Sequence, residues 1–136
     1  IKDIKRRKIK VEELISKFEL DAVRKVEAKF LSGGMKRRLV ISMSLLGEPE
    51  ILLMDEPLAA LDPQTIQMLQ TIIIKLQSEY NLTILITDHQ ARDLLVVCDR
   101  AVILSNSKIV AEGTPNQLMQ NDNAAKYYFG DNFKFK

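Results

Sequence analysis

The sequence is poor in the features that mark secreted and membrane-spanning proteins. Cys98 is its only cysteine, so no internal disulfide can form, which fits either a reducing compartment or a chain indifferent to redox conditions. No apolar run approaches the roughly 18 residues that a bilayer-spanning helix needs. The basic start of the sequence also has no apolar segment behind it. We therefore expect a chain that neither spans a membrane nor is secreted.

The chain also has almost no excess of charge of either sign. The formal net charge is +2 over 136 residues, which is too small to argue for nucleic-acid binding. The basic run at residues 5–8 is interpreted as a solvated start of the chain. With 46% hydrophobic residues, the chain can bury one core, and a single globular domain is the expectation.

Hydrophobic periodicity predicts helices that alternate with buried strands, an order typical of an α/β fold with a parallel sheet. Helical spacing of apolar residues predicts helices over residues 11–18, 34–46, 63–79 and 91–98. Continuous apolar runs predict strands over residues 51–54 and 82–87. A hairpin is predicted around residues 105–108, a capping box opens a short helix at Thr114, and the aromatic residues within 124–136 are expected to pack as anchors.

Two acidic residues follow the first predicted strand. Asp55 and Glu56 come directly after the apolar residues 51–54, at the carboxyl end where parallel sheets bind ligands. The first carboxylate could hold Mg²⁺, directly or through water, and the second could polarise a water for attack on a phosphoryl group. Taken alone, an apolar strand that ends in Asp-Glu is common and usually marks a solvated strand end.

A glycine-rich loop precedes this strand. Leu31, Ser32, Gly33, Gly34 and Met35 lead into a predicted helix, with Ser32 as its N-cap. Free N–H groups at such a helix start, together with the basic residues 36–38, favour an approaching anion. The plainer interpretation is a helix entrance with a solvated basic face.

Two further polar residues stand at predicted element boundaries. Asp62 precedes Pro63 and fits an N-cap with proline at the first helical position. His89, the only histidine, follows the second predicted strand, whose end would lie beside Asp55 and Glu56 if the strands are neighbours. A lone histidine is by itself more often structural or exposed.

In this order and spacing, residues 31–35, 51–56, 58–62 and 89 resemble the signature loop, Walker B strand, D-loop and H-loop of the ATP-binding subunits of ABC transporters. The resemblance covers nearly the whole chain. It implies a partial P-loop NTPase fold of the α/β class, with a mainly parallel sheet, covering helices and a C-terminal hairpin. It also implies ATP and Mg²⁺ as cofactors, Asp55 as the metal residue, and Glu56 and His89 as catalytic residues. The residues that it implies for binding the nucleotide of a second subunit are Leu31, Ser32, Gly33, Gly34, Met35 and Asp62.

The first half of the family's motifs is missing from the sequence. None of the five glycines is followed by lysine, so there is no P-loop of the form Gly-x-x-x-x-Gly-Lys to cradle phosphates. No glutamine precedes the signature loop as the family's Q-loop would. We therefore expect the C-terminal half of an ATP-binding subunit, inactive alone. Its expected parts are a helical signature subdomain over 1–47, the C-terminal part of the RecA-like core over 48–113, and a helical tail over 114–136.

Residues 86–89, 98–100, 113–115 and 128–133 resemble the lipopolysaccharide-export branch of the family, and branched-chain amino-acid importers are near relatives. The resemblance implies a cytoplasmic dimer of ATP-binding subunits, held on the inner membrane by membrane permease subunits, with no nucleic acid as a partner. Two other classes stay open. One is the C-terminal ATPase lobe of a chromosome-maintenance or DNA-repair protein, against which Pro57 and the absence of heptads argue. The other is a non-catalytic remnant that serves as an interaction module.

Overall fold

The computed structural model describes residues 4–124 of the chain. The chain divides into two compact units, Ile1–Thr87 and Asp88–Lys136, and each is described by itself. The three-part division at residues 47 and 113 stays a prediction. The aromatic residues predicted to act as anchors after residue 124 lie outside the described residues.

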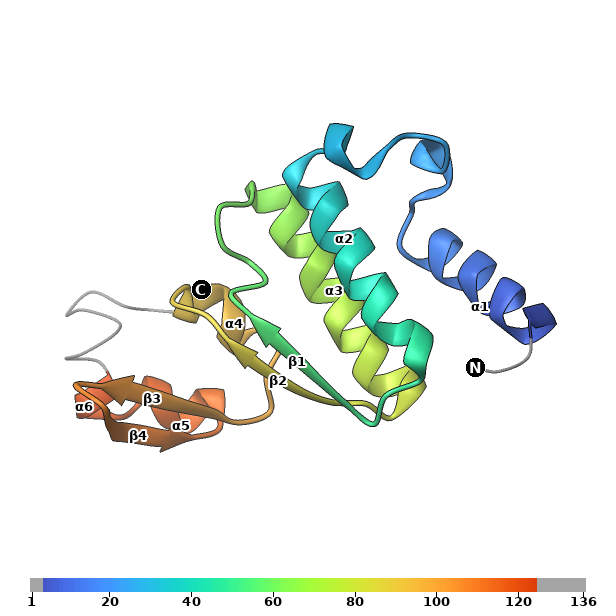
Figure 1. Cartoon of the computed structure of the whole chain (residues 1–136). Coiled ribbons are helices and arrows are strands. Elements are labelled where there is room, and N and C mark those ends of the chain that lie inside the picture. The colour runs from blue at the N-terminus through green and yellow to red at the C-terminus, as the bar shows by residue number, and fades with distance from the viewer. Residues whose placement is uncertain (1–3, 125–136) are drawn as a thin grey trace. The chain divides into compact units, whose positions relative to one another are not determined.

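The first unit contains three long helices and a pair of parallel strands (Figure 1). Its elements are α1 (Ile4–Lys17), η1 (Asp21–Val23), η2 (Ala28–Phe30), α2 (Gly33–Ser44), η3 (Leu45–Gly47), β1 (Ile51–Asp55), α3 (Pro63–Tyr80) and β2 (Thr83–Thr87). The two strands pair in parallel register from Ile51↔Thr83 to Asp55↔Thr87. This confirms the predicted parallel neighbours and puts both strand ends at one edge.

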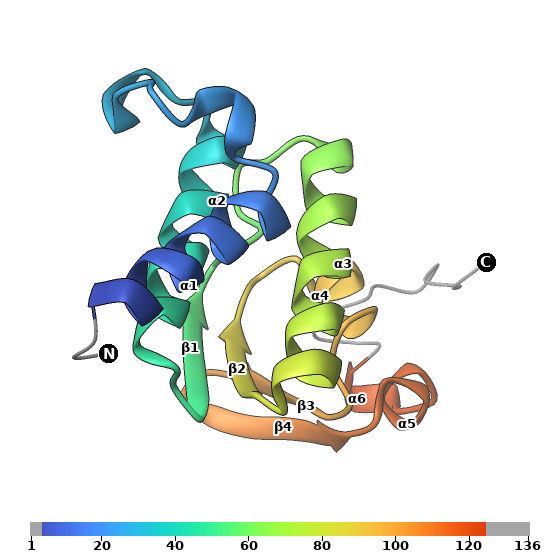
Figure 2. The ribbon, with the colours of Figure 1, turned by 90° about the vertical axis from the view of Figure 1, so that its right-hand side faces the viewer.

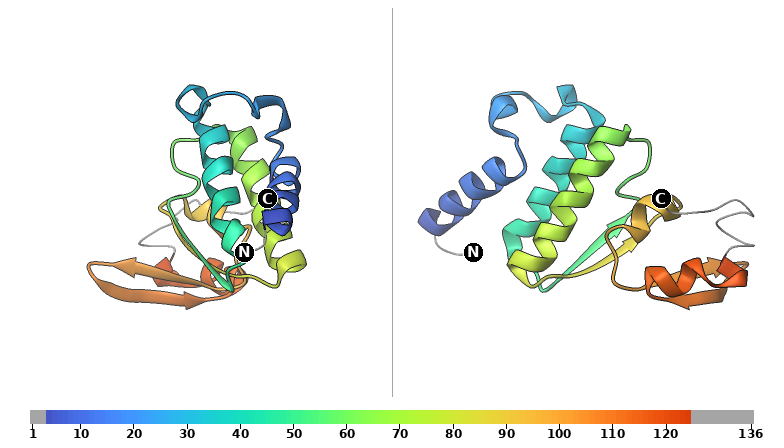
Figure 3. Two further views of the ribbon diagram at one scale, coloured as in Figure 1. Left: turned by 45° about the vertical axis from the view of Figure 1, so that its right-hand side comes forward. Right: turned by 180° about the vertical axis from the view of Figure 1, so that it is seen from behind.

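The helices α2 and α3 lie side by side over the β1–β2 pair (Figures 1 and 3). Leu52 and Met54 point into the core, whereas Ile51 and Leu53, which alternate with them, are 61% and 69% exposed. In β2, Leu85 is 61% exposed in the same way. The strands therefore bury one face and leave the other face apolar and open.

Buried residues from several elements fill the core of this unit. Phe18, Leu58, Leu69 and Leu76 are fully buried, and Leu69 and Leu76 lie on the inner side of α3. The guanidinium of Arg38 on α2 is also buried, and its Nη1 donates a hydrogen bond to the carbonyl of Phe18 at 3.1 Å. Arg38 thus satisfies an open carbonyl at the end of α1 and ties that helix to α2.

The second unit is a hairpin with short helices around a small core. Its elements are α4 (Ala91–Leu95), β3 (Ala101–Ser105), β4 (Lys108–Gly113), α5 (Pro115–Met119) and α6 (Asp122–Ala124). The strands pair in antiparallel register, which confirms the predicted hairpin, and the predicted capping box is present between Thr114 and Gln117. Leu95, Ile103, Ala111, Leu118 and Ala124 form the core.

The helix predicted over residues 91–98 is shorter than expected. It ends at Leu95, because the N–H of Val97 donates to the carbonyl of Leu94 and tightens the chain into a turn. Cys98 therefore follows the helix, but it still packs against the core of this unit. Burial raises the pKa of its thiol. Within residues 4–124, no helix combines the length and the apolar character that crossing a membrane requires.

Candidate functional site

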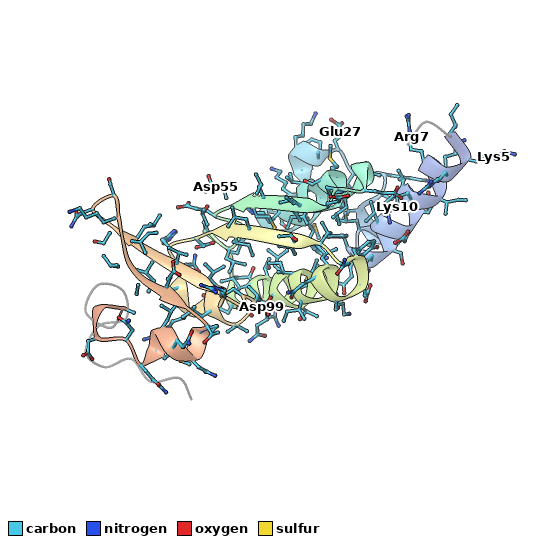
Figure 4. The ribbon with its side chains drawn as sticks, turned by 90° about the horizontal axis from the view of Figure 1, so that it is seen from below. Lys5, Arg7, Lys10, Glu27, Asp55 and Asp99 are labelled. Carbon is cyan, nitrogen blue, oxygen red and sulfur yellow. The ribbon has the colours of Figure 1, made fainter. Side chains whose placement is uncertain are left out.

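The carboxyl ends of β1 and β2 bring Asp55 and Thr87 together. The two residues are direct partners in the parallel register, and the Thr87 hydroxyl donates a hydrogen bond to Oδ1 of Asp55. Both side chains are exposed, and Asp55 extends from the end of β1 into the open (Figure 4). The second oxygen of Asp55 can therefore face a ligand while the first is held by Thr87.

Glu56 follows Asp55 in a tight and unusual turn. Its φ of 45° places it in the left-handed region, which only glycine, asparagine and aspartate visit readily. Its N–H donates to the carbonyl of Thr87 at 2.7 Å, and Pro57 and Leu58 behind it are fully buried. The backbone of Glu56 is thus fixed on both sides, and its exposed side chain leaves the strand end in a set direction.

Thr87 is a member of this site to which the sequence analysis assigned no role, although it ends the strand expected beside Asp55 and Glu56. One hydroxyl and one carbonyl of Thr87 contact two neighbouring acidic residues. The sequence signal for Thr87 was a hydroxyl-bearing residue at the end of the second predicted strand. Only the register of the two strands shows that Thr87 faces Asp55.

The glycine-rich loop of residues 31–35 leads into α2 as predicted. Ser32 is the N-cap, and its Oγ accepts a hydrogen bond from the N–H of Met35 at 3.2 Å. The hydroxyl proton of Ser32 remains available to donate. A side chain at Gly33 would meet no atom within 4 Å, so a ligand can approach the backbone there, whereas Leu31 is buried and anchors the loop.

Asp62 caps the start of α3 as predicted, with Pro63 in the first turn. Its Oδ1 accepts from the N–H of Thr65 at 3.0 Å, and its Oδ2 accepts from the Thr65 hydroxyl at 2.6 Å. These bonds, the hydroxyl's first and the N–H's second, hold the pKa of Asp62 below its ordinary value. The N-termini of α2 and α3 lie next to each other in the first unit (Figures 1 and 2).

His89 lies in the second unit, two residues after Thr87. Its imidazole is 64% exposed, and Nδ1 lies 3.8 Å from Oδ1 of the buried Asp88. The same Asp88 oxygen accepts the N–H of Gln90 at 2.9 Å. Asp88 therefore fixes the chain around His89, and the ring reaches outward from this turn.

The carboxylate ligands at the strand end fit Mg²⁺ only when nucleotide phosphates supply further ligands. Among residues 4–124, no group of three or more His, Cys, Asp or Glu side chains is arranged to hold a metal ion. Mg²⁺ commonly binds through one or two carboxylates together with substrate phosphates and water. The single carboxylate of Asp55 suits that role.

A cleft of about 570 Å³ lies elsewhere in the first unit. Its lining includes Lys10, Glu48, Glu50, Tyr80 and Thr83. Glu50 and Thr83 lie at the amino ends of the two strands, opposite to Asp55 and Thr87. The cleft is therefore separate from the predicted nucleotide-facing residues.

Comparison with known proteins finds similarity to ATP-binding proteins of ABC transporters. The family model of the ABC transporter matches residues 3–59. The chain is 40% identical over 128 residues to the lipopolysaccharide export system ATP-binding protein LptB of Haemophilus influenzae, and 36% identical to LptB of Escherichia coli K12. Each alignment covers 94% of this chain and 53% of the relative. The chain thus spans about half the length of the curated relatives it matches.

A solved structure shows the same fold. The nucleotide-free ATP-binding cassette from an ABC transporter superposes with a TM-score of 0.80 at 22% identity, over 96% of this chain and 52% of the other. This confirms the predicted α/β fold as part of a P-loop NTPase fold of the ABC type.

Proposed function

Because this chain is similar in sequence and in fold to the ATP-binding proteins of ABC transporters, we propose that it supplies the signature, Walker B, D-loop and H-loop residues of such a subunit. The observation that carries the proposal is the shared edge of β1 and β2, where Asp55 and Glu56 are both tied to Thr87. We propose lipopolysaccharide export as the transport process, on the strength of the LptB relatives.

The exposed strand end and the family resemblance support the following proposed roles. Mg²⁺, when bound, neutralises charge on the phosphate oxygens of ATP. Asp55, whose Oδ1 accepts a hydrogen bond from Thr87, would hold this ion directly or through water. Glu56 accepts a proton from the attacking water, since its carboxylate is exposed beside Asp55 on a fixed backbone. For His89, which belongs to the second unit, the family resemblance alone supports a role in holding the attacking water or contacting the terminal phosphate.

The signature loop acts on the nucleotide of a second subunit. The Ser32 hydroxyl donates to the terminal phosphate, and the N–H groups after it at the start of α2 add further donors. Gly33 lets the backbone approach closely, because nothing lies within 4 Å of the position of its missing side chain. Leu31 and Met35 flank these donors, and Asp62 approaches the same nucleotide from the start of α3.

The chain needs other polypeptide to complete the reaction. No Gly-Lys pair occurs among the 136 residues, so the P-loop must come from the N-terminal half of the subunit. The signature loop also needs a second ATP-binding subunit, and coupling to transport needs membrane permease subunits. Such a protein is cytoplasmic, peripheral on the inner membrane through those partners, and does not require nucleic acid.

Joining this chain to the part of Haemophilus influenzae LptB that it does not cover tests the proposal directly. The joined protein is expected to hydrolyse ATP, and Glu56→Gln should reduce turnover by about 10²-fold or more, because the positioned base is lost. Glu50→Gln is the matched control, since Glu50 precedes the same strand at its opposite end. Equal turnover in the Glu56 and Glu50 variants would contradict the assigned role.

The transport process is tested in cells. Escherichia coli depleted of its own LptB should grow when it carries the joined protein and fail to grow with the Glu56→Gln variant. ATP hydrolysis in the purified protein without rescue of these cells would retain the ATPase assignment and refute lipopolysaccharide export as its process.

A further inference from the structure

The two glycines of the signature loop have different surroundings. A side chain at Gly33 would meet nothing within 4 Å. A Cβ at Gly34 would stand 2.7 Å from Cγ2 and 3.1 Å from Oγ1 of Thr65. Real Cβ atoms essentially never come as close as the first of these distances. A side chain at Gly34 would therefore force Thr65 or one of the two helix starts to shift.

Thr65 is the residue on the α3 side of this contact, and it also holds the D-loop. Its hydroxyl donates to Oδ2 of Asp62 at 2.6 Å, and its N–H donates to Oδ1 at 3.0 Å. The methyl and hydroxyl groups branch from one Cβ, so their directions are linked. A push on the methyl from the Gly34 side turns the hydroxyl away from Asp62.

We propose that Thr65 is a positioning residue that couples the signature loop to Asp62. Its methyl group lies where a Cβ at Gly34 would stand, and its hydroxyl group donates a hydrogen bond to the Asp62 carboxylate. The two loops thus keep one spacing, and a shift in either is transmitted to the other through a single side chain.

The consequence for catalysis rests on the proposed function. There, the signature loop and Asp62 both approach a nucleotide held by a second subunit. If the signature loop and Asp62 moved independently, both would have to become ordered separately in every catalytic turnover. With Thr65 between them, they arrive as one preformed surface, which lowers the entropy lost on closure. Thr65 itself touches no reacting atom.

Titration of the Asp62 carboxyl group by NMR in the full 136-residue chain provides the test. Thr65 lowers the pKa of this group chiefly through its hydroxyl, so the pKa reports the Thr65–Asp62 bond. The variants are Gly34→Ala, Gly33→Ala, Thr65→Ser, Thr65→Val and Gly34→Ala combined with Thr65→Ser. The three atoms nearest to a Cβ at position 34 all belong to Thr65, so we expect an effect of Gly34→Ala on the pKa of Asp62 to pass through Thr65.

Gly34→Ala and Thr65→Val are expected to raise the pKa of Asp62 toward its ordinary value. Gly33→Ala and Thr65→Ser should leave it low, because neither disturbs the hydroxyl. The double variant should restore most of the shift, since serine lacks the methyl group that an alanine at position 34 would strike. A pKa that is the same in Gly34→Ala as in Gly33→Ala overturns the proposal.

If Gly34→Ala prevents folding, Thr65→Val decides the outcome, because valine keeps the shape of threonine and lacks only the hydroxyl. An unchanged pKa of Asp62 in that variant also overturns the coupling. ATP turnover of the joined protein is measured separately. Its complete absence would count against the proposed function, whereas the coupling is judged by the titration alone.

Discussion

The open face of the β1–β2 pair predicts that the isolated chain associates with itself and binds hydrophobic dyes. Ile51, Leu53 and Leu85 are 61%, 69% and 61% exposed. Full burial of such a side chain contributes about 1.5–3 kcal/mol, so covering the exposed part of all three contributes about 3–6 kcal/mol. Two such faces in contact gain about twice that, against an association cost of about 4–15 kcal/mol. The association should therefore be weak and dependent on concentration.

Leu53→Lys tests this prediction, because it places a charge at the most exposed of the three positions. We expect the variant to lose dye fluorescence and to elute as a monomer of 15.5 kDa, whereas the wild-type chain elutes earlier as its concentration rises. Ile74→Lys is the control, since Ile74 is 45% exposed on α3 rather than on the strands. A wild-type chain that stays monomeric at all concentrations, binds no dye and melts in one sharp transition would refute the reasoning. That result would favour an independently folding interaction module.

Five further results are expected. The chain alone should neither bind ATP tightly nor hydrolyse it, because the P-loop that makes most phosphate contacts is absent; turnover that Glu56→Gln abolishes would contradict this. In the joined protein, His89→Ala should reduce turnover by about 10²-fold or more, and an unchanged rate would assign His89 a purely structural role. Ser32→Ala should reduce turnover less, because it removes one hydrogen-bond donor among several. Leu118→Ala should lower the free energy of unfolding by about 2–5 kcal/mol, since Leu118 is fully buried in the second unit; a urea midpoint equal to that of the wild type would contradict the packing. The pKa of Asp62 is lower in the folded state, so its stabilising effect is complete above the unfolded-state pKa of about 4 and is lost as pH falls through the folded value. The difference in urea midpoint between the wild type and Asp62→Asn should therefore shrink on acidification, and a difference that grows would contradict this sign.

Local sequence rules predicted most of the elements. Caps marked the starts of α2, α3 and α5, at Ser32, Asp62 and Thr114, because a capping side chain acts on N–H groups only two or three residues away. Apolar runs located β1 and β2 within a residue or two. By contrast, residues 20–31 gave little periodic signal, and the structure forms two short 3₁₀ turns there.

The site was less predictable wherever it depends on contacts between distant segments. The positions of Asp55 and Glu56 followed from the strand pattern, but the bonds from both residues to Thr87 depend on a register that no local rule supplies. Likewise, Gly33 and Gly34 are equivalent in the sequence, and only the neighbouring first turn of α3 separates their roles. The roles of the individual site residues stay predictions.

The left-handed backbone of Glu56 bears on the evolutionary history of the chain. Holding a non-glycine residue in that region costs about 1–2 kcal/mol, and glycine or asparagine at this position would relieve much of the cost. In a gene copy that no longer serves catalysis, that exchange would cost no function and would stabilise the folded chain. Glu19 and Glu48 share the left-handed region and form ion pairs with Arg38 and Arg6; at Glu56, the proposed role in catalysis is what would maintain the carboxylate.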